Sequence, residues 1–316
     1  MVSRDEYSRY INELLKNDPK AAELSKLSNS NSSLAAFFTV AGIILTILGL
    51  FLIFSTQFFF ILIIGIIFLI IGFSKNIQKS GLMNYLSSTY KAQIIDYLLK
   101  DHPHTYDHND YLDEKIFNDS QFHDYGFMKN RYDVYEGEDL LKINIPNDDG
   151  SKSDNYLSLC DLLVEEIETN EDGEKQTYTI YDGTFGYIDF PFNFKCALII
   201  NTSYKRKDLK FQKIELEDIK FNQKFKILGT DQIEARYILT PVMMENLMRL
   251  FKSFHRFSLV LVDDKMYLGF PYKNLFEFAT LKSGRPESIF DNFYTDIETI
   301  LNIVNELKTN NKIFKI

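Results

Sequence analysis

The chain has 316 residues, of which 45% are hydrophobic and 15% aromatic, with 28 Phe, 19 Tyr and no Trp. A length of this order suffices for about two domains with sizeable cores. Lys and Arg number 35 against 44 Asp and Glu, a net charge of −9. This acidic balance argues against nucleic-acid binding, because phosphate groups repel negative charge. The two cysteines, Cys160 and Cys196, argue against a disulfide scaffold and are typical of a reducing compartment.

Residues 1–33 are predicted to form an N-terminal amphipathic arm. Helical spacing of apolar residues predicts a short helix over residues 4–16, through Tyr7, Tyr10, Ile11, Leu14 and Leu15. Asp18 followed by Pro19 is typical of a helix start and predicts a second short helix, Pro19–Leu27. Ser28–Ser33 is predicted to be a polar linker. This N-terminal segment is either an interfacial helix or a loosely ordered tail.

Residues 34–73 contain no Asp, Glu, Lys, Arg or His. A single helix of this length would be about 60 Å long, roughly twice the hydrocarbon core of a bilayer. Polar residues gather only in the middle, at Ser55, Thr56 and Gln57. The stretch therefore predicts a transmembrane helical hairpin, Leu34–Phe54 and Phe58–Phe73. A soluble core hairpin is the weaker alternative, because buried soluble helices usually keep a polar stripe.

The glycines and the flanking charges add two expectations about this hairpin. Gly42 and Gly49 lie seven residues apart, as do Gly65 and Gly72, so each pair lies on one helix face where small residues permit close packing. Basic residues flank both ends of the hairpin: Arg4, Arg9, Lys16, Lys20 and Lys26 before it, and Lys75, Lys79 and Lys91 after it. Lys and Arg favour the cytoplasmic side, which predicts a multi-pass protein of the cell membrane with cytoplasmic N- and C-termini.

Residues 74–104 are predicted to form a connecting helix that ends near Asp101–Pro103, because Pro disfavours helix at the residue before it. Residues 105–316 are predicted to form a cytoplasmic, mainly antiparallel α+β domain. Alternating runs predict strands at Gln176–Tyr181, Thr184–Phe190, Cys196–Asn201, Lys210–Leu216, Lys224–Leu228, Phe257–Val262 and Lys265–Phe270. Asp182-Gly183 and Asp263-Asp264 are the expected hairpin turns.

Helices are expected in the same domain after Asp231, whose spacing to Glu234 predicts a capping box, and over Pro241–Phe254. A terminal amphipathic helix is predicted from one apolar face: Ile289, Phe293, Ile297, Ile300, Leu301, Val304 and Leu307.

The common catalytic and cofactor motifs are missing from the sequence, including phosphate-binding loops, dinucleotide fingerprints, nucleophile elbows and paired Cys motifs. We therefore predict no catalytic, cofactor-binding or metal residues. Three groups remain as weaker candidates. His102, His104 and His108 could ligate a metal, although a solvated loop explains them better. The basic run Lys205-Arg206-Lys207 could touch lipid headgroups or simply be a turn. Asp231, Glu234 and Arg236 could act as acid–base groups, although helix capping explains their spacing.

The run Asp231-Gln232-Ile233-Glu234-Ala235-Arg236-Tyr237-Ile238-Leu239-Thr240-Pro241 resembles a bacterial membrane-protein family catalogued as domain of unknown function 3137. Segments around Phe117–Phe122, Tyr135–Asp139 and Asp182–Gly186 are similar to other parts of that family. The resemblance implies a two-pass inner-membrane protein with a cytoplasmic domain of no established activity. It also suggests a LemA-like membrane protein as a partner.

Two functions from different classes follow as hypotheses. The first is a non-enzymatic protein-binding or scaffolding module held at the lipid bilayer. The second is a membrane-tethered hydrolase acting on a lipid or nucleotide. A flat exposed apolar patch favours the first, and a concave pocket that gathers carboxylates with displaced pKa values favours the second.

Overall fold

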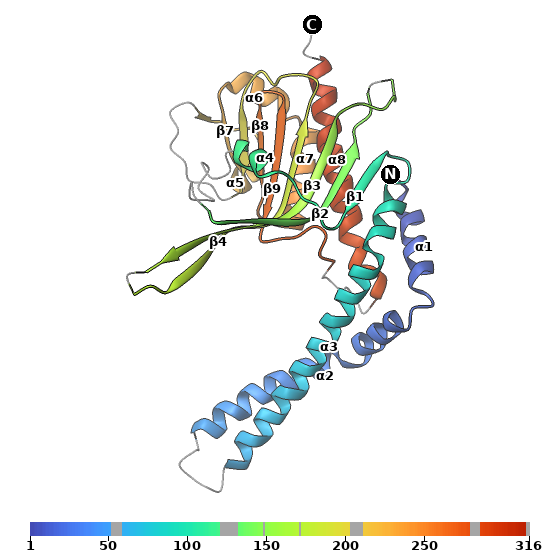
Figure 1. Cartoon of the computed structure of the whole chain (residues 1–316), viewed down its shortest axis with the longest axis vertical. Coiled ribbons are helices and arrows are strands. Elements are labelled where there is room, and N and C mark those ends of the chain that lie inside the picture. The colour runs from blue at the N-terminus through green and yellow to red at the C-terminus, as the bar shows by residue number, and fades with distance from the viewer. Residues whose placement is uncertain are drawn as a thin grey trace. The chain divides into compact units, whose positions relative to one another are not determined.

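The computed structural model describes residues 1–51, 59–120, 132–147, 149–170, 172–202, 211–278 and 285–313. The chain divides into two compact units. Figure 1 labels their helices and strands and colours the chain from blue at the N-terminus to red at the C-terminus. The helical unit comprises Val2–Tyr97 and Glu277–Asn292. The sheet unit comprises Met1, Leu98–Phe276 and Phe293–Ile316.

The helical unit is built on α1 (Arg4–Leu15), α2 (Pro19–Phe51) and α3 (Phe59–Leu98), with the short 3-10 helix η3 (Pro286–Phe290). The predicted first helix is confirmed by α1. Ser3 caps the start of α1, where its hydroxyl oxygen accepts a hydrogen bond from the Glu6 amide at 3.3 Å. Tyr7 of α1 is buried, and its hydroxyl donates to the Phe290 carbonyl at 3.1 Å.

The polar linker expected at Ser28–Ser33 is wrong, because these residues continue α2 without a break. Ser and Asn reduce helix stability by only a few tenths of a kcal/mol each, and extending an existing helix is cooperative. The segment also lacks Gly and Pro between Lys20 and Ala41. The expected connecting helix is likewise continuous with the second apolar segment, and α3 ends at Leu98.

The sheet unit contains a nine-stranded antiparallel sheet in the order β1-β2-β3-β4-β9-β8-β5-β7-β6. Its strands are β1 (His104–Asp107), β2 (Val134–Asn144), β3 (Tyr156–Thr169), β4 (Lys175–Asp189), β5 (Leu198–Asn201), β6 (Gln212–Lys213), β7 (Lys226–Gly229), β8 (Ser258–Val262) and β9 (Lys265–Pro271). Its helices are α4 (Glu114–Asp119), α5 (Ile219–Lys224), α6 (Gln232–Ile238), α7 (Pro241–Phe254) and α8 (Asp291–Ile313). The predicted α+β class with antiparallel pairing is confirmed.

The hairpin turn expected at Asp182-Gly183 is wrong, because one strand, β4, runs through both residues and pairs with β3 throughout. Gly183 adopts φ +148°, and a Cβ there would lie well inside van der Waals distance of the Phe270 carbonyl oxygen. The glycine therefore permits close strand approach instead of a turn.

The remaining predicted elements agree with the structure to within a few residues, apart from one strand. The bounds of α7 are as predicted, and β8, β9, β5 and β7 each lie within about two residues of the expected strands. The strand expected at Lys210–Leu216 is reduced to β6. The apolar face predicted for α8 is buried, although Ile289 belongs to η3.

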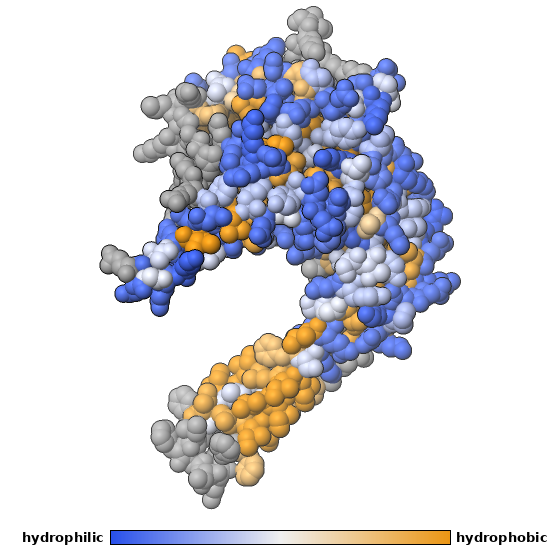
Figure 2. All heavy atoms as spheres, viewed as in Figure 1, coloured by the Kyte–Doolittle hydropathy of each residue, from blue (hydrophilic) through white to orange (hydrophobic). Residues whose placement is uncertain are grey.

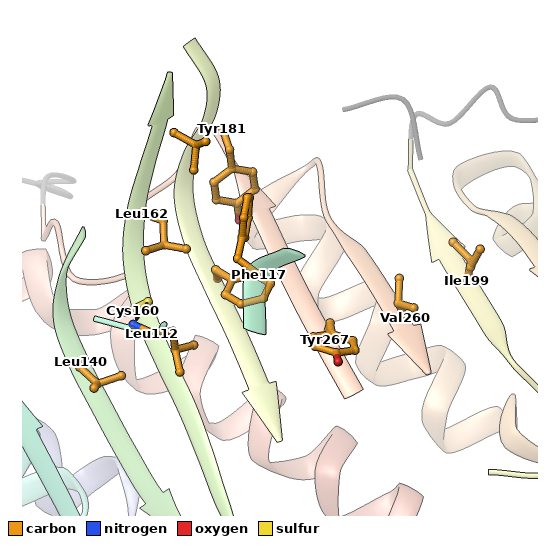
Figure 3. Close-up of a cluster of buried hydrophobic side chains, with 11 residues drawn as sticks. Leu112, Phe117, Leu140, Cys160, Leu162, Tyr181, Ile199, Val260 and Tyr267 are labelled. Atoms are coloured by element: carbon orange, nitrogen blue, oxygen red, sulfur yellow. Dashed lines mark hydrogen bonds between the residues drawn. The ribbon is translucent and has the colours of Figure 1, made fainter. Parts of the chain in front are cut away.

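The core of the sheet unit lies on both faces of the sheet. On one face Phe117 of α4 packs against the rings of Tyr135, Tyr181 and Phe185, with ring centroids 5.2–5.6 Å from that of Phe117. Figure 3 shows Phe117 and Tyr181 within this buried cluster. On the other face Phe254 of α7 stacks on Phe270 of β9 at 4.1 Å. Each fully buried aromatic side chain of this kind stabilises the fold by roughly 1.5–3 kcal/mol.

Candidate functional site

A continuous band of exposed apolar side chains covers the apolar halves of α2 and α3, and we call it the apolar belt (Figure 2). Its members on α2 are Phe37, Val40, Ile43, Ile44, Ile47, Leu48 and Leu50, and on α3 they are Phe60, Ile63, Ile64, Ile66, Ile67, Ile70, Ile71, Phe73 and Ile77. Their exposed fractions run from 36% at Ile71 to 71% at Phe60. An exposed apolar surface of this extent is typical of a membrane or protein contact.

The inner side of the same helix pair is lined by glycines. A Cβ at Gly42 would lie 2.8 Å from the Leu69 amide nitrogen, and one at Gly65 would lie 2.6 Å from that of Thr46. A Cβ at Gly49 would lie 2.7 Å from Leu62 Cα. These contacts join early α3 to late α2, so the helices are antiparallel. The predicted role of Gly42, Gly49 and Gly65 in close helix packing is confirmed.

One helix in the described part of the chain is long and apolar enough to cross a membrane, Phe60–Leu98 within α3. The described apolar stretch of α2 is shorter, Ala36–Leu50. The predicted turn at Ser55–Gln57 lies outside the described residues. The structure thus supports membrane association, whereas the second crossing and the orientation stay predictions.

The three candidate histidines of the sheet unit have different partners. His102 Nε2 lies 2.7 Å from the amino nitrogen of Met1, and burial is the main cause that lowers the pKa of His102. His104 Nδ1 lies 2.8 Å from the His102 carbonyl oxygen. His108 contacts a β-bulge in β2, where the register with β3 shifts between Glu138 and Leu141. Its Nδ1 lies 2.8 Å from Asp139 Oδ1.

His108, Glu138 and Asp139 form the one group of potential metal ligands found among the described residues, with ligand atoms within 4.8 Å of one another. Asp139 is fully buried at φ +66° and also accepts a hydrogen bond from the Tyr106 hydroxyl. Burial, followed by that hydrogen bond, raises the pKa of Tyr106. The imidazole lies between the two carboxylates, with its Nε2 3.8 Å from Glu138 Oε2. The sequence interpretation missed Asp139 and Tyr106, since nothing in the local pattern marks a bulge.

Both cysteines are free and buried. Burial raises the pKa of the Cys160 thiol to about 12 and that of Cys196 to about 11. Thiols of this kind are poor nucleophiles at neutral pH, because the reactive species is the thiolate.

The candidate acid–base group is occupied by structural contacts. Asp231 caps α6 by accepting from the amides of Ile233 and Glu234 at 2.8 and 3.0 Å. Glu234 lies 3.8 Å from Lys195 Nζ, and Arg236 donates to the Glu215 carbonyl at 3.2 Å. The basic run Lys205–Lys207 lies outside the described residues.

A cavity of about 380 Å³ opens at the end of β4, lined by Ile145, Pro146, Asn147, Asp149, Asn155, Ile188, Asp189, Phe190, Pro191 and Lys308. Its charged groups are engaged locally. Asp189 accepts from the Tyr187 hydroxyl at 2.5 Å and lies 3.1 Å from Lys265 Nζ, and Lys308 donates to the Pro146 carbonyl. Asp149 is exposed, and its pKa is lowered by hydrogen bonds from Ser151. The cavity therefore has room for a small ligand but no unsatisfied acid–base pair among these groups.

Exposed apolar residues also gather on the short helices of the sheet unit. Ile219 of α5 is 72% exposed, Ile233 of α6 is 66% exposed and Val242 of α7 is 54% exposed. Tyr237 lies four residues after Ile233, on the same face of α6. We call Ile233, Tyr237 and Val242 the α6 patch. The α6 patch was not predicted, although the spacing of Ile233 and Tyr237 was a usable signal.

Part of this chain is similar to a known protein family. Residues 179–309 match the family described as protein of unknown function (DUF3137). The DUF3137 match begins within β4, ends within α8 and includes the α6 patch, and it confirms the predicted resemblance over these residues. No curated protein matches the chain.

A solved structure with weak similarity is the crystal structure of the mycobacterial trehalose monomycolate transport factor A, TtfA. The identity is 8% and the TM-score is 0.35, over 69% of this chain and 94% of that one.

Proposed function

We propose that this protein is anchored in a bilayer by α2 and α3, and that its sheet unit is a non-enzymatic module that binds another protein. The apolar belt carries the first part of this proposal. Side chains such as Ile43, Ile67 and Ile70 would contact water in a soluble protein, and each would lose roughly 1.5–3 kcal/mol relative to burial. In lipid the same side chains are solvated favourably.

The helix pair further supports two crossings over one. Glycine contacts hold the apolar half of α2 against the apolar half of α3, so both halves would enter the same apolar phase. Two crossings return the chain to its starting side. The flanking Lys and Arg residues favour a cytoplasmic position for both termini.

The binding role of the sheet unit is supported by the α6 patch. Soluble surfaces usually expose large apolar side chains singly, whereas Ile233 and Tyr237 are both exposed on one face of α6, and Val242 is exposed at the start of α7. The partner that the family resemblance suggests is a LemA-like membrane protein.

Crosslinking followed by mass spectrometry in native membranes tests the binding role. We expect one reproducible partner, whose crosslinks map to α6 and α7 and disappear in Ile233→Asp. The matched control is Ile219→Asp, which places the same charge at an equally exposed apolar residue outside the α6 patch. Recovery of no partner, or equal loss in both variants, would contradict the proposal.

A membrane-tethered hydrolase acting on lipid or nucleotide is the second candidate, and the cavity at the end of β4 is the observation that favours it. If Asp189→Asn abolished a measurable hydrolysis of phospholipid or nucleoside triphosphate by the purified chain, this candidate would replace the first. The engagement of Asp189 by Lys265 and Tyr187 makes a purely structural role the expected result.

A further inference from the structure

The ends of β3 and β4 extend beyond the rest of the sheet as a two-stranded ribbon, which we call the arm (Figure 1). Pairing of β2 with β3 ends at Val134↔Glu165, and pairing of β9 with β4 begins only at Gly183↔Pro271. Between these limits β3 and β4 pair with each other out to Thr169↔Lys175. Among the described residues no third strand joins the arm.

The arm contributes little to the stability of the fold. Most of its residues from Glu166 to Thr179 are exposed. Ordering each residue opposes folding by roughly 1–2 kcal/mol, and an isolated two-stranded ribbon is marginally stable in water. A short turn after Val164 would close the sheet equally well. The extension therefore needs a reason outside the fold itself.

The two long edges of the arm differ in chemistry. Beyond the last β2 pair, the β3 edge carries Glu166 and Glu168, charges of the kind that protect strand edges from pairing. The β4 edge reads Lys-Gln-Thr-Tyr-Thr-Ile over residues 175–180, with neither an acidic residue nor Pro. Its outward backbone N–H and C=O groups can therefore accept an added strand.

We propose that the β4 edge over residues 175–180 binds an extended segment of a partner protein that contains Lys or Arg, by addition of that segment as a further strand. This inference rests on the proposed protein-binding role and names the partner's chemistry. Residues 165–175 hold six acidic side chains and one Lys. That charge repels a second copy of the arm and attracts a basic segment.

Side-chain positions on the arm fit such a segment. Tyr178 pairs with Glu166 and Gln176 pairs with Glu168 in the β3–β4 register, so all four side chains share one face. The Tyr178 hydroxyl donates to Gln176 Oε1 at 2.6 Å, and Tyr178 is 44% exposed. An added strand beside β4 would place a basic side chain against the Tyr178 ring, with the Glu166 carboxylate on its far side.

Peptide binding to the full chain in detergent micelles tests this inference. The probe is a decapeptide of alternating Lys and Val, and its control replaces each Val with Pro, which keeps the charge and prevents strand pairing. We expect the Lys-Val peptide to bind and to protect amides within residues 175–180 from hydrogen exchange. Equal binding of both peptides, no binding, or protection confined to other strands would overturn the inference.

Charge reversal gives a second readout. Glu166→Lys with Glu168→Lys should weaken binding of the Lys-Val peptide at least tenfold. The control, Asp154→Lys with Glu217→Lys, makes the same change in net charge at exposed residues elsewhere and should leave binding within twofold. Equal weakening in both variants would show nonspecific attraction and would overturn the inference.

Two further outcomes separate this inference from the proposed function. Protection of residues 175–180 that rises with protein concentration in the absence of peptide would identify a second copy as the occupant and overturn the inference. If a crosslinked partner still binds the Glu166→Lys, Glu168→Lys variant, the proposed protein-binding function stands and the inference about the arm is overturned.

Discussion

The two units of this molecule place similar side chains in opposite ways. In the helix pair, Ile and Phe point outward and glycines line the contact, whereas in the sheet unit the aromatic residues point inward around Phe117 and Phe185. The contrast teaches that hydrophobic content alone does not specify a core. Where the inward positions are taken by Gly, the outward apolar side chains require an apolar surrounding phase.

Removal of a central ring of the sheet unit should have the largest effect on stability. Phe185→Ala leaves a cavity beside Phe117 and should lower the free energy of unfolding of the sheet unit by about 3–5 kcal/mol. Urea unfolding of the full chain in micelles, followed by tyrosine near-ultraviolet circular dichroism, measures this change. Ile219→Ala, at a 72% exposed residue, is the control and should stay within about 0.5 kcal/mol.

The buried thiols provide a chemical test of the same interior. Because burial raises the pKa of Cys160 to about 12, its thiolate fraction at pH 8 should be roughly 10³-fold below that of a thiol with pKa near 9. Alkylation should be very slow in the folded chain, should accelerate as pH rises, and should become rapid in guanidinium. Fast alkylation of the folded chain at pH 8 would show that the interior around Cys160 is open.

A charge in the apolar belt should act only on the helical unit. Ile67→Lys should oppose membrane insertion by about 2.5–3.5 kcal/mol if residue 67 lies near the bilayer centre. The measurement is the fraction of protein retained in membranes after carbonate washing. Ile233→Lys, at a more exposed residue of the sheet unit, should leave retention unchanged. Equal effects from both substitutions would remove the distinction between the two surfaces.

Enlarging an inward glycine should separate the helices. Gly65→Val places atoms against the Thr46 backbone and should destabilise the pair by about 1–3 kcal/mol. Gly81→Val, also in α3, meets nothing within 4 Å and serves as the control. Denaturation of the helices in micelles, followed by far-ultraviolet circular dichroism, reports the stability of the pair, which should fall in the first variant alone. Equal stability of both variants would contradict close packing at Gly65.

Loss of a helix cap is the smallest expected effect. Asp231→Ala removes the carboxylate that accepts hydrogen bonds from two backbone N–H groups at the start of α6, and it should lower the free energy of unfolding by about 1 kcal/mol. Glu234→Gln changes only the 3.8 Å contact to Lys195 and should change stability by a few tenths of a kcal/mol. A larger loss in Glu234→Gln would point to a role for this carboxylate beyond its contact with Lys195.

Strong local signals predicted their elements well. Pro241 after a capping Thr240 defined α7, and the regular apolar spacing defined α8. Long-range contacts decided the elements that the sequence analysis missed. The turn at Asp182-Gly183 failed because the approach of Phe270 requires Gly183 within a strand, and the linker at Ser28–Ser33 failed because helix continuation outweighs weak propensities.

The candidate sites also divide into those with a local sequence signal and those formed by long-range contacts. The apolar belt and its glycines were predictable because lipid solvation depends on composition and helical period alone. The contact between His108 and Asp139 joins β1's end to a bulge in β2, residues that are 31 positions apart, and no local pattern encodes it.

Labelling in intact cells tests most directly the claim that α2 and α3 cross the bilayer as a hairpin. A membrane-impermeant maleimide is applied to Thr56→Cys and to Asn76→Cys, against the silent background expected from buried Cys160 and Cys196. The account predicts labelling of Thr56→Cys in intact cells and of Asn76→Cys only after permeabilisation. Labelling of both residues from the same side would contradict it.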